Sequence, residues 1–309
     1  MASSAPTHVS QAAQLEIAGS RPLQAVAADV LSLTKPRLSS LVMFTAAGGV
    51  WLSGAHFDWL HWVLVMLGTW GTVGGANALN CWLERDSDKY MARTANRPLP
   101  AGRMEPGHAL AWGIGLAVVS LPLLAVVANL LTAVLGGVAL LSYVLVYTPL
   151  KARSSWAMVA GSLPGALPPL MGWSAGTGGL GVGGLSLFAI LFVWQLPHSL
   201  AISLYRKEEY RAAGLTSLAL RSGDDAARAW SVGLSVLLVV VSVGPYFAKL
   251  AGPGYLFVAV ALSVGFLAIA VQGAAKKLGP KWARRYFLSS LIYLVGLFVA
   301  LGFDGGLRG

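Results

Sequence analysis

The sequence predicts an all-α polytopic membrane protein, in which nine transmembrane helices form a bundle. Three observations predict this class. The 309 residues are 56% hydrophobic and only 11% charged, whereas soluble domains carry about 25% charged residues. The apolar residues form continuous runs, and about 20 such residues cross a bilayer as a helix. The basic residues gather in alternate loops. A soluble globular enzyme is excluded, and the apolar content also excludes a disordered chain.

Nine apolar stretches are the expected membrane spans. They cover residues 39–57, 60–83, 108–128, 130–149, 156–176, 185–205, 229–248, 254–274 and 286–303. Strands of a membrane β-barrel would instead alternate in polarity over about ten residues. We therefore expect residues 31–309 to form one transmembrane domain. Residues 1–30 are expected to form a mobile cytoplasmic tail, with a short amphipathic helix near residues 22–33.

The distribution of Lys and Arg predicts the orientation of the chain. Twenty of the 22 lie in the N-terminal segment or in the loops after the second, fourth, sixth and eighth spans, and only Lys249 and Arg308 lie on the other side. Because positive loops stay in the cytoplasm, we expect the N-terminus inside and the C-terminus outside. Residues 1–30 show no secretory or transit signal, which favours a bacterial inner (plasma) membrane. The net charge of +10 then requires no nucleic-acid partner.

A polar cluster ends the second span. Asn80, Glu84 and Asp88 are four residues apart, a spacing that stacks side chains on one helix face. Acids at the edge of a span are costly and usually functional, and three oxygen-bearing side chains suit Mg²⁺. The alternative is a solvated loop in which the acids pair with neighbouring cations. Arg93 and Arg97 follow directly, and cations beside a metal-binding face indicate a diphosphate site.

A second polar group lies in the sixth span and the loop that follows it. Gln195 and His198 interrupt an apolar run. His198 is either a packed histidine, a heme contact or a proton-handling group. Glu208 and Glu209 resemble a second carboxylate cluster on the same side of the membrane as the first. Two such clusters facing one cavity could hold two Mg²⁺ ions against a diphosphate leaving group.

The third basic loop contains Lys151, which is either a phosphate ligand or an ordinary positive-inside anchor. The single cysteine, Cys81, excludes an internal disulfide and a thiol-rich metal site.

Five groups of motifs resemble the UbiA-type intramembrane prenyltransferases, over about residues 33–303. They are LTKPR at 33–37, Asn80-x-x-x-Glu84-x-x-x-Asp88, RTANRPLP at 93–100, YTPLK at 147–151 with GALPPLMGW at 165–173, and WQLPH at 194–198 with Glu209-Tyr210. The WQLPH motif resembles the branch that acts on heme, because the quinone and chlorophyll branches are not expected to carry Gln-x-Pro-His there. The chain departs from the family pattern near Met158, usually Asn, and at Glu84, Ser199 and Glu209, where the family usually has Asp, Phe and Asp.

The resemblance implies a cytoplasm-facing cavity, farnesyl diphosphate and protoheme IX as substrates, and Mg²⁺ as cofactor. Farnesyl transfer to a heme vinyl group, with water addition, would give heme o. The implied metal ligands are Asn80, Glu84, Asp88, Glu208 and Glu209. The implied diphosphate contacts are Lys35, Arg37, Arg93, Arg97, Lys151 and Arg206. The implied heme contacts are His198 and Gln195. Catalysis would depend on Asn80, Glu84, Asp88, Arg93 and Lys151, and the aromatic candidates beside the allylic cation are Trp70, Trp82, Trp194 and Tyr147.

Two other functions remain open from the sequence. The first is a prenyltransferase of the same superfamily that acts on a quinone precursor, against which Gln195 and His198 argue. The second is a membrane transporter, although transport usually needs polar groups at mid-membrane depth with access to both sides. The lipid bilayer surrounds the chain in each case. For the heme branch, a heme a synthase or a terminal oxidase is the expected protein partner.

Overall fold

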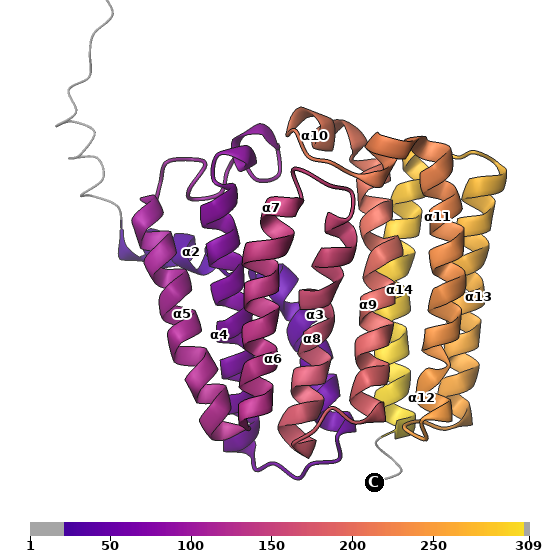
Figure 1. The fold of residues 1–309 in the computed structure, drawn as a ribbon, viewed down its shortest axis with the longest axis horizontal. Coiled ribbons are helices and arrows are strands. Elements are labelled where there is room, and N and C mark those ends of the chain that lie inside the picture. Colours follow the sequence, from indigo (N-terminus) through magenta and orange to yellow (C-terminus); the bar gives the residue numbers. More distant parts are fainter. Residues whose placement is uncertain (1–21, 306–309) are drawn as a thin grey trace, which may run out of the picture.

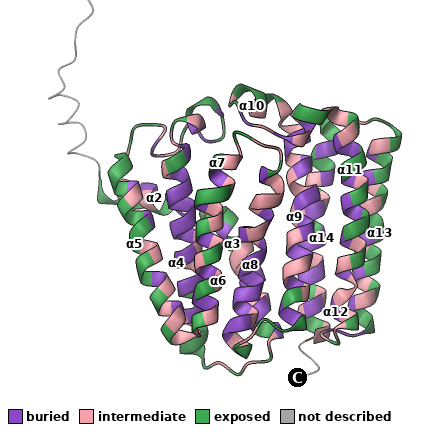
Figure 2. Cartoon of the chain, viewed as in Figure 1, coloured by how far each residue is buried: buried purple, intermediate pink, exposed green. Residues whose placement is uncertain are grey.

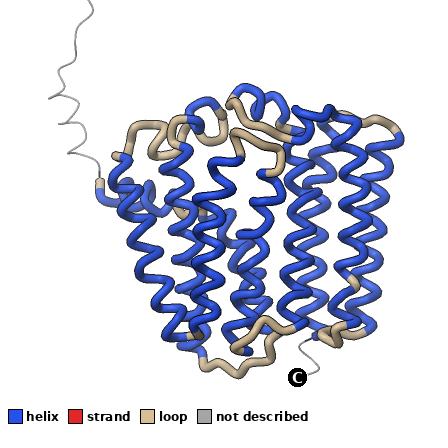
Figure 3. The backbone as a smooth tube through the Cα atoms, viewed as in Figure 1, coloured by secondary structure: helices blue, strands red, loops and turns tan. Residues whose placement is uncertain are grey.

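The structure is a computed structural model that describes residues 22–305, and these residues form helices, turns and loops without a strand (Figure 3). The long helices stand side by side, and α2 (Leu23–Leu33) lies across them at one edge (Figure 1). The long helices are α3 (Pro36–Leu52), α4 (Trp59–Glu84), α5 (Pro106–Val127), α6 (Leu130–Leu141), α8 (Ala157–Thr177), α9 (Val182–Tyr205), α11 (Leu218–Ser242), α13 (Pro253–Ala275) and α14 (Pro280–Gly305). The short elements are the 3₁₀-helix η1 (Ser87–Tyr90), the π-helix η2 (Ser142–Tyr147), α7 (Thr148–Leu150), α10 (Lys207–Ala212) and α12 (Gly244–Phe247).

The predicted class, an all-helical multi-pass membrane protein, is confirmed. Within residues 22–305, six helical segments are long and apolar enough to span a membrane: α5, α6 with its continuation to Leu150, α9, α11 with α12, α13 and α14. The remaining predicted spans correspond to α3, α4 and α8, which pack inside the same bundle. Large apolar side chains lie on the outer surface: Val126 on α5 and Phe257 on α13 are 85% and 77% exposed. Figure 2 shows the exposed residues along the outer helices in green. The count of nine spans stays a prediction.

Two predicted boundaries were wrong in ways that the local sequence explains. Helix α3 ends at Leu52 rather than near residue 57, because the chain turns at Ser53 and at Gly54, whose φ is 70°. Helix α11 begins at Leu218 rather than near residue 229, because a short charged segment with a kink at Gly223, whose φ is 83°, precedes its apolar run. Part of the predicted tail, residues 1–21, lies outside the described residues. The helix expected near residues 22–33 is α2.

The basic loops lie at one end of the bundle. The turn with η1, the loop between α7 and α8, α10, and the connection between α13 and α14 are all at the top of Figure 1, whereas α14 ends at the bottom. The loops predicted to be basic therefore lie together at one end of the bundle. The compartment that each end faces stays a prediction.

Close packing of α3 against α8 brings the two halves of the chain together. A Cβ atom on Gly172 of α8 would overlap the carbonyl oxygen of Ala46 on α3, and one on Gly49 would overlap that of Pro169. Small residues let helix backbones approach closely in membranes, where van der Waals packing holds helices together. Helix α8 also packs against α9, so α8 links α3 to the C-terminal helices.

Replacing Gly172 by alanine tests this contact. Overpacking a tight site costs about 1–3 kcal/mol, so Gly172→Ala should lower the temperature of thermal unfolding in detergent. The matched control is Gly265→Ala on α13, where a Cβ would meet open space and alanine favours the helix by about 1 kcal/mol. Equal unfolding temperatures for the two variants would contradict the close approach of α3 and α8.

Candidate active site

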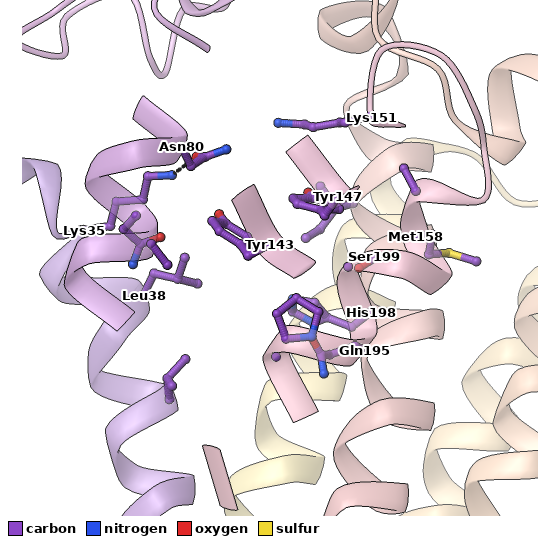
Figure 4. A pocket seen from close by; sticks show the side chains of 18 of the residues that line it. Lys35, Leu38, Asn80, Tyr143, Tyr147, Lys151, Met158, Gln195, His198 and Ser199 are labelled. Atoms are coloured by element: carbon purple, nitrogen blue, oxygen red, sulfur yellow. Dashed lines mark hydrogen bonds between the residues drawn. The ribbon is translucent and has the colours of Figure 1, made fainter. Parts of the chain in front are cut away.

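A cavity of about 410 Å³ lies between α3, α4, η2, α8 and α9. Its polar end is at the basic-loop end of the bundle, where side chains from η1, the loop after α7 and the segment after α10 reach it. Figure 4 shows Lys35, Asn80 and Lys151 at this end, the rings of Tyr143 and Tyr147 below them, and His198 with Gln195 deeper. The cavity therefore has a charged mouth and an aromatic interior.

Asn80 is fixed by contacts on both sides of its amide. Its Oδ1 accepts a hydrogen bond from Lys35 Nζ at 2.5 Å, and its Nδ2 donates to Thr148 Oγ1 at 3.0 Å. Thr148 in turn donates to the carbonyl oxygen of Tyr143 at 2.8 Å. The amide oxygen of Asn80 is thus directed at the charged part of the cavity. Thr148 belongs to the YTPLK motif, but its contact with Asn80 could not be predicted, because the two residues are 68 positions apart.

Glu84 and Asp88 reach the same cavity from different elements. Glu84 is the last residue of α4, whereas Asp88 lies in η1, so the prediction of one continuous helix face was wrong beyond Glu84. The turn is held by Thr94, whose Oγ1 donates to the carbonyl oxygen of Asp88 at 2.8 Å. Lys151 Nζ lies 3.0 Å from Glu84 Oε1, and Arg97 Nη1 lies 2.6 Å from Asp88 Oδ2.

The two lysines of the mouth have different electrostatic environments. Burial lowers the pKa of Lys151, but the Tyr147 hydroxyl and the Glu84 carboxylate outweigh burial, so the pKa of Lys151 lies above its ordinary value. Burial lowers the pKa of Lys35, and nearby Arg97 adds to this effect, so the pKa of Lys35 lies below its ordinary value. An incoming anion would offset the desolvation of Lys35.

The mouth contains more positive than negative groups. The basic residues that line it are Lys35, Arg93, Arg97 and Lys151, and the acidic residues are Glu84 and Asp88. This excess suits a polyanion such as diphosphate. Arg37 was expected in the same group, but it is exposed on α3 and does not line the cavity.

The oxygen atoms at the mouth fit a magnesium ion. Asn80, Glu84 and Asp88 offer one amide and two carboxylates on one cavity wall. Within the described part of the chain, no group of three or more His, Cys, Asp or Glu side chains could hold a metal. Magnesium, however, typically takes one or two carboxylates and completes its shell with water and substrate phosphate. The donor set therefore suits Mg²⁺ bound together with a diphosphate.

The second predicted carboxylate cluster lies elsewhere. Glu208 and Glu209 border a separate cavity of about 300 Å³, and so does Arg206. Arg206 Nη1 lies 2.9 Å from both carboxylate oxygens of Glu209, and Glu208 pairs with Arg211. The expectation that these residues face the first cluster across one cavity was wrong for this structure. The helix α10 turns them away, and Tyr210 lines the main cavity instead.

A π-helical turn forms the aromatic wall. Helix α6 continues as η2, and the rings of Tyr143 and Tyr147 stack with centroids 5.3 Å apart. Gly161 makes room for this wall, because a Cβ there would overlap the Tyr147 ring. Single π turns inside helices are frequent at functional sites. Of the predicted aromatic residues, Tyr147 and Trp194 line the cavity, and Tyr143 was missed.

His198 and Gln195 lie deeper in the cavity, as predicted from the sixth span. Gln195 Nε2 donates to the carbonyl oxygens of Leu191 at 3.0 Å and Ser162 at 3.2 Å, so both its amide hydrogens bind backbone. Gly165 leaves space for the Gln195 amide. Gln195 therefore joins α8 to α9 beside the cavity, whereas His198 retains a ring edge toward it.

The backbone at Lys35 is held in an uncommon conformation. Its φ is 50°, in the left-handed region that non-glycine residues seldom adopt. Asn77 stabilises this corner, because its Nδ2 donates to the carbonyl oxygen of Thr34 and to Ser39 Oγ, both at 3.2 Å. Asn77 lies about one helical turn before Asn80, a spacing that could have revealed it. Strained backbone that the surroundings hold in place is typical of ligand sites.

Comparisons with known proteins identify the family of the chain. The model of the UbiA prenyltransferase family matches residues 41–291. A protoheme IX farnesyltransferase of Myxococcus xanthus is 59% identical over 91% of this chain and 96% of its own length. A protoheme IX farnesyltransferase of Anaeromyxobacter dehalogenans is 50% identical over 88% of this chain and 92% of its own.

Solved structures share the fold at low sequence identity. A structure of digeranylgeranylglyceryl phosphate synthase superposes with a TM-score of 0.79 at 18% identity, covering 92% of this chain and 99% of its own. A UbiA homolog from Archaeoglobus fulgidus, solved with DMAPP and Mg²⁺ bound, superposes with a TM-score of 0.65 at 18% identity, covering 88% of this chain and 99% of its own. The matched family model, the curated relatives and the fold lead to one conclusion: the chain belongs to the UbiA prenyltransferase family.

Proposed function

We propose that this protein transfers the farnesyl group of farnesyl diphosphate to a vinyl group of protoheme IX, with addition of water, to make heme o. One observation carries the proposal: a single cavity joins a magnesium-type oxygen set and four cations at its mouth to an aromatic interior that contains His198. The relatives named protoheme IX farnesyltransferase, at up to 59% identity, support heme as the acceptor.

The mouth would bind and activate the diphosphate. Asn80, Glu84 and Asp88 would hold Mg²⁺, which neutralises charge on the diphosphate when bound. Lys35 and Lys151, with Arg93 and Arg97, would donate charge-assisted hydrogen bonds to its oxygens. As the allylic C–O bond breaks, the electron pair leaves with the diphosphate, and these fixed donors stabilise the growing negative charge.

The interior would protect and direct the farnesyl cation. The stacked rings of Tyr143 and Tyr147 lie below the charged mouth (Figure 4), and aromatic faces attract cations more strongly where water is excluded. A vinyl carbon of the porphyrin then forms the new C–C bond with the allylic carbon. Water adds to the resulting benzylic-type cation, and its proton leaves with the diphosphate, so that atoms and charge balance.

The membrane setting follows from the two substrates. The farnesyl chain and the porphyrin face are apolar, whereas the diphosphate and the propionates are anionic. We infer nine spans, a bacterial inner membrane and a mouth open to the cytoplasm, because 20 of the 22 Lys and Arg residues belong to the basic-loop side. A heme a synthase or a terminal oxidase would then receive the product.

An assay of the purified protein tests the reaction. Protein in nanodiscs receives protoheme IX, farnesyl diphosphate and Mg²⁺, and the extracted hemes are analysed by mass spectrometry. We expect a product with the mass of protoheme plus farnesyl plus hydroxyl, and none with EDTA. Unchanged heme together with a prenylated quinone precursor would overturn heme as acceptor, and no transfer to either acceptor would overturn the reaction.

The carboxylate at Asp88 offers a test with a close control. Asp88→Asn should abolish turnover even at high Mg²⁺, because an amide cannot replace the carboxylate charge at the metal. Asp86→Asn is the matched control, since Asp86 is exposed and pairs with Lys89 in the same turn. An active Asp88→Asn enzyme would refute the assignment. Glu209→Gln should keep its Mg²⁺ dependence, and a loss there would reinstate the second cluster.

The hydroxyl that orients Asn80 is a further test. Thr148→Val keeps the side-chain shape but removes the acceptor for the Asn80 amide. Outer partners of metal ligands change metal affinity by about 10–100-fold, so the Mg²⁺ concentration for half-maximal activity should rise by about that factor. The control is Thr177→Val at the far end of α8, where the hydroxyl bonds only nearby backbone. An unchanged Mg²⁺ requirement would show that Thr148 does not orient Asn80.

A further inference from the structure

His198 is held in a fixed orientation by α9 and α14. Its Nδ1 lies 2.7 Å from the Oγ of Ser290 on α14. The imidazole also contacts two aromatic rings, Trp194 with centroids 4.6 Å apart and Phe287 with centroids 4.9 Å apart. Trp194 Nε1 donates to the carbonyl oxygen of Ser290 at 2.7 Å. One serine therefore contacts the histidine through its side chain and the tryptophan through its backbone.

The hydrogen bonds of Ser290 determine which ring nitrogen of His198 carries the proton. Ser290 is fully buried, and its Oγ donates to the carbonyl oxygen of Phe287 at 2.6 Å. A hydroxyl has only one hydrogen to donate. With that hydrogen directed at the Phe287 carbonyl oxygen, the Ser290 oxygen is left as acceptor for His198, which assigns the ring hydrogen to Nδ1. A neutral imidazole with Nδ1–H has an unprotonated Nε2.

The Nε2 atom is available to a ligand. His198 lines the main cavity (Figure 4). Its Nε2 has no hydrogen-bond partner among residues 22–305, and this atom is not among the buried polar atoms that lack a partner. The neighbouring side-chain nitrogens are already engaged, Trp194 Nε1 by Ser290 and Gln195 Nε2 by the backbone of Ser162 and Leu191. His198 Nε2 is thus a nitrogen with an unused lone pair in this part of the cavity wall.

We propose that Ser290 is a positioning residue that holds His198 as the Nδ1–H tautomer, so that Nε2 presents its lone pair to the iron of the porphyrin acceptor. The proposal rests on the proposed function, in which that acceptor is protoheme IX. Neutral imidazole is a common metal ligand, and ligating histidines almost always donate their other N–H to a protein acceptor. Here the acceptor is Ser290 Oγ, which in turn donates to the carbonyl oxygen of Phe287, and these two linked hydrogen bonds polarise the His198 ring.

Iron ligation would also set the position of the reacting vinyl group. A bond from His198 Nε2 to the iron fixes the centre of the porphyrin beside α9, below the charged mouth. The vinyl groups lie on the rim of the macrocycle, so the ring can reach toward the allylic carbon while the iron stays bound. If Nε2 instead carried the hydrogen, it would present a donor to the iron and could not ligate it.

The test is a titration of protoheme IX into the purified full-length protein without farnesyl diphosphate, followed by absorption spectroscopy. The wild type should show an imidazole-ligated heme spectrum, which His198→Ala should abolish. Ser290→Ala removes the acceptor but keeps the backbone contact with Trp194, and the apparent Kd for heme should rise about 10–100-fold. Ser290→Thr restores a hydroxyl and should restore the ligated spectrum.

The matched control is Ser289→Ala. Ser289 is the neighbour on α14, and its Oγ donates only to the carbonyl oxygen of Tyr286, so this variant should bind heme like the wild type. Mg²⁺-dependent binding of farnesyl diphosphate should be unchanged in every variant, which also checks folding. Where Ser290→Ala does not fold, Ser290→Cys supplies a weak sulfur acceptor and should give an intermediate affinity.

Each outcome decides the proposal separately from the proposed function. A wild-type spectrum and affinity in Ser290→Ala would overturn the positioning role of Ser290. A wild-type spectrum in His198→Ala would overturn iron ligation and favour a proton-handling role for Nε2. Ligated heme that is never farnesylated would instead defeat the proposed function while leaving the role of Ser290 intact.

Discussion

Ionic groups at the edge of a bilayer are costly unless they are paired, and the arrangement of this protein depends on how two ion pairs and one hydrogen bond from a lysine meet at one cavity. Glu84 pairs with Lys151 and Asp88 with Arg97, whereas Asn80 accepts the hydrogen bond from Lys35. Each contact joins segments that are distant in sequence or separated by a turn. These contacts fix five segments around a common mouth: α4, η1, η2, α7 and the corner before α3.

The site depends on departures from regular helix. The π turn at η2 supports the stacked tyrosines, and the corner before α3 directs Lys35 at Asn80. In an apolar environment such irregular backbone persists only where other groups satisfy it, and Thr148 and Asn77 supply those hydrogen bonds. Close glycine contacts between α3 and α8 keep the walls together. The shape of the cavity is therefore set by a few positions rather than by the apolar helices in general.

The sequence was sufficient for the class of protein and for seven residues that line the mouth of the cavity, but it also assigned Arg37, Arg206, Glu208 and Glu209 there, which lie elsewhere. The bilayer constrains hydropathy and the distribution of charge along the chain, so both can be interpreted directly. The acids near residue 84 stand out because acids are rare in such a chain. The π turn left no periodic signal, since η2 is as apolar as a regular span. The placement of Glu208 and Glu209 failed because α10 rotates the acids away from the cavity. Ser290 could not be found, because its contacts with His198 and Trp194 cross 92 and 96 residues.

The paired state of the mouth has a thermodynamic consequence. Glu84 and Asp88 are each paired with a basic residue of the mouth, and neither Glu84 nor Lys151 can meet a ligand fully without loosening its hold on the other. A cation taken up by the carboxylates releases the basic groups, and an anion taken up by the basic groups releases the carboxylates. The two ligands must then raise each other's affinity by the same factor. Entry of substrate at this mouth is an exchange of ionic partners, in which neither ligand alone gains the full stabilisation that both gain together.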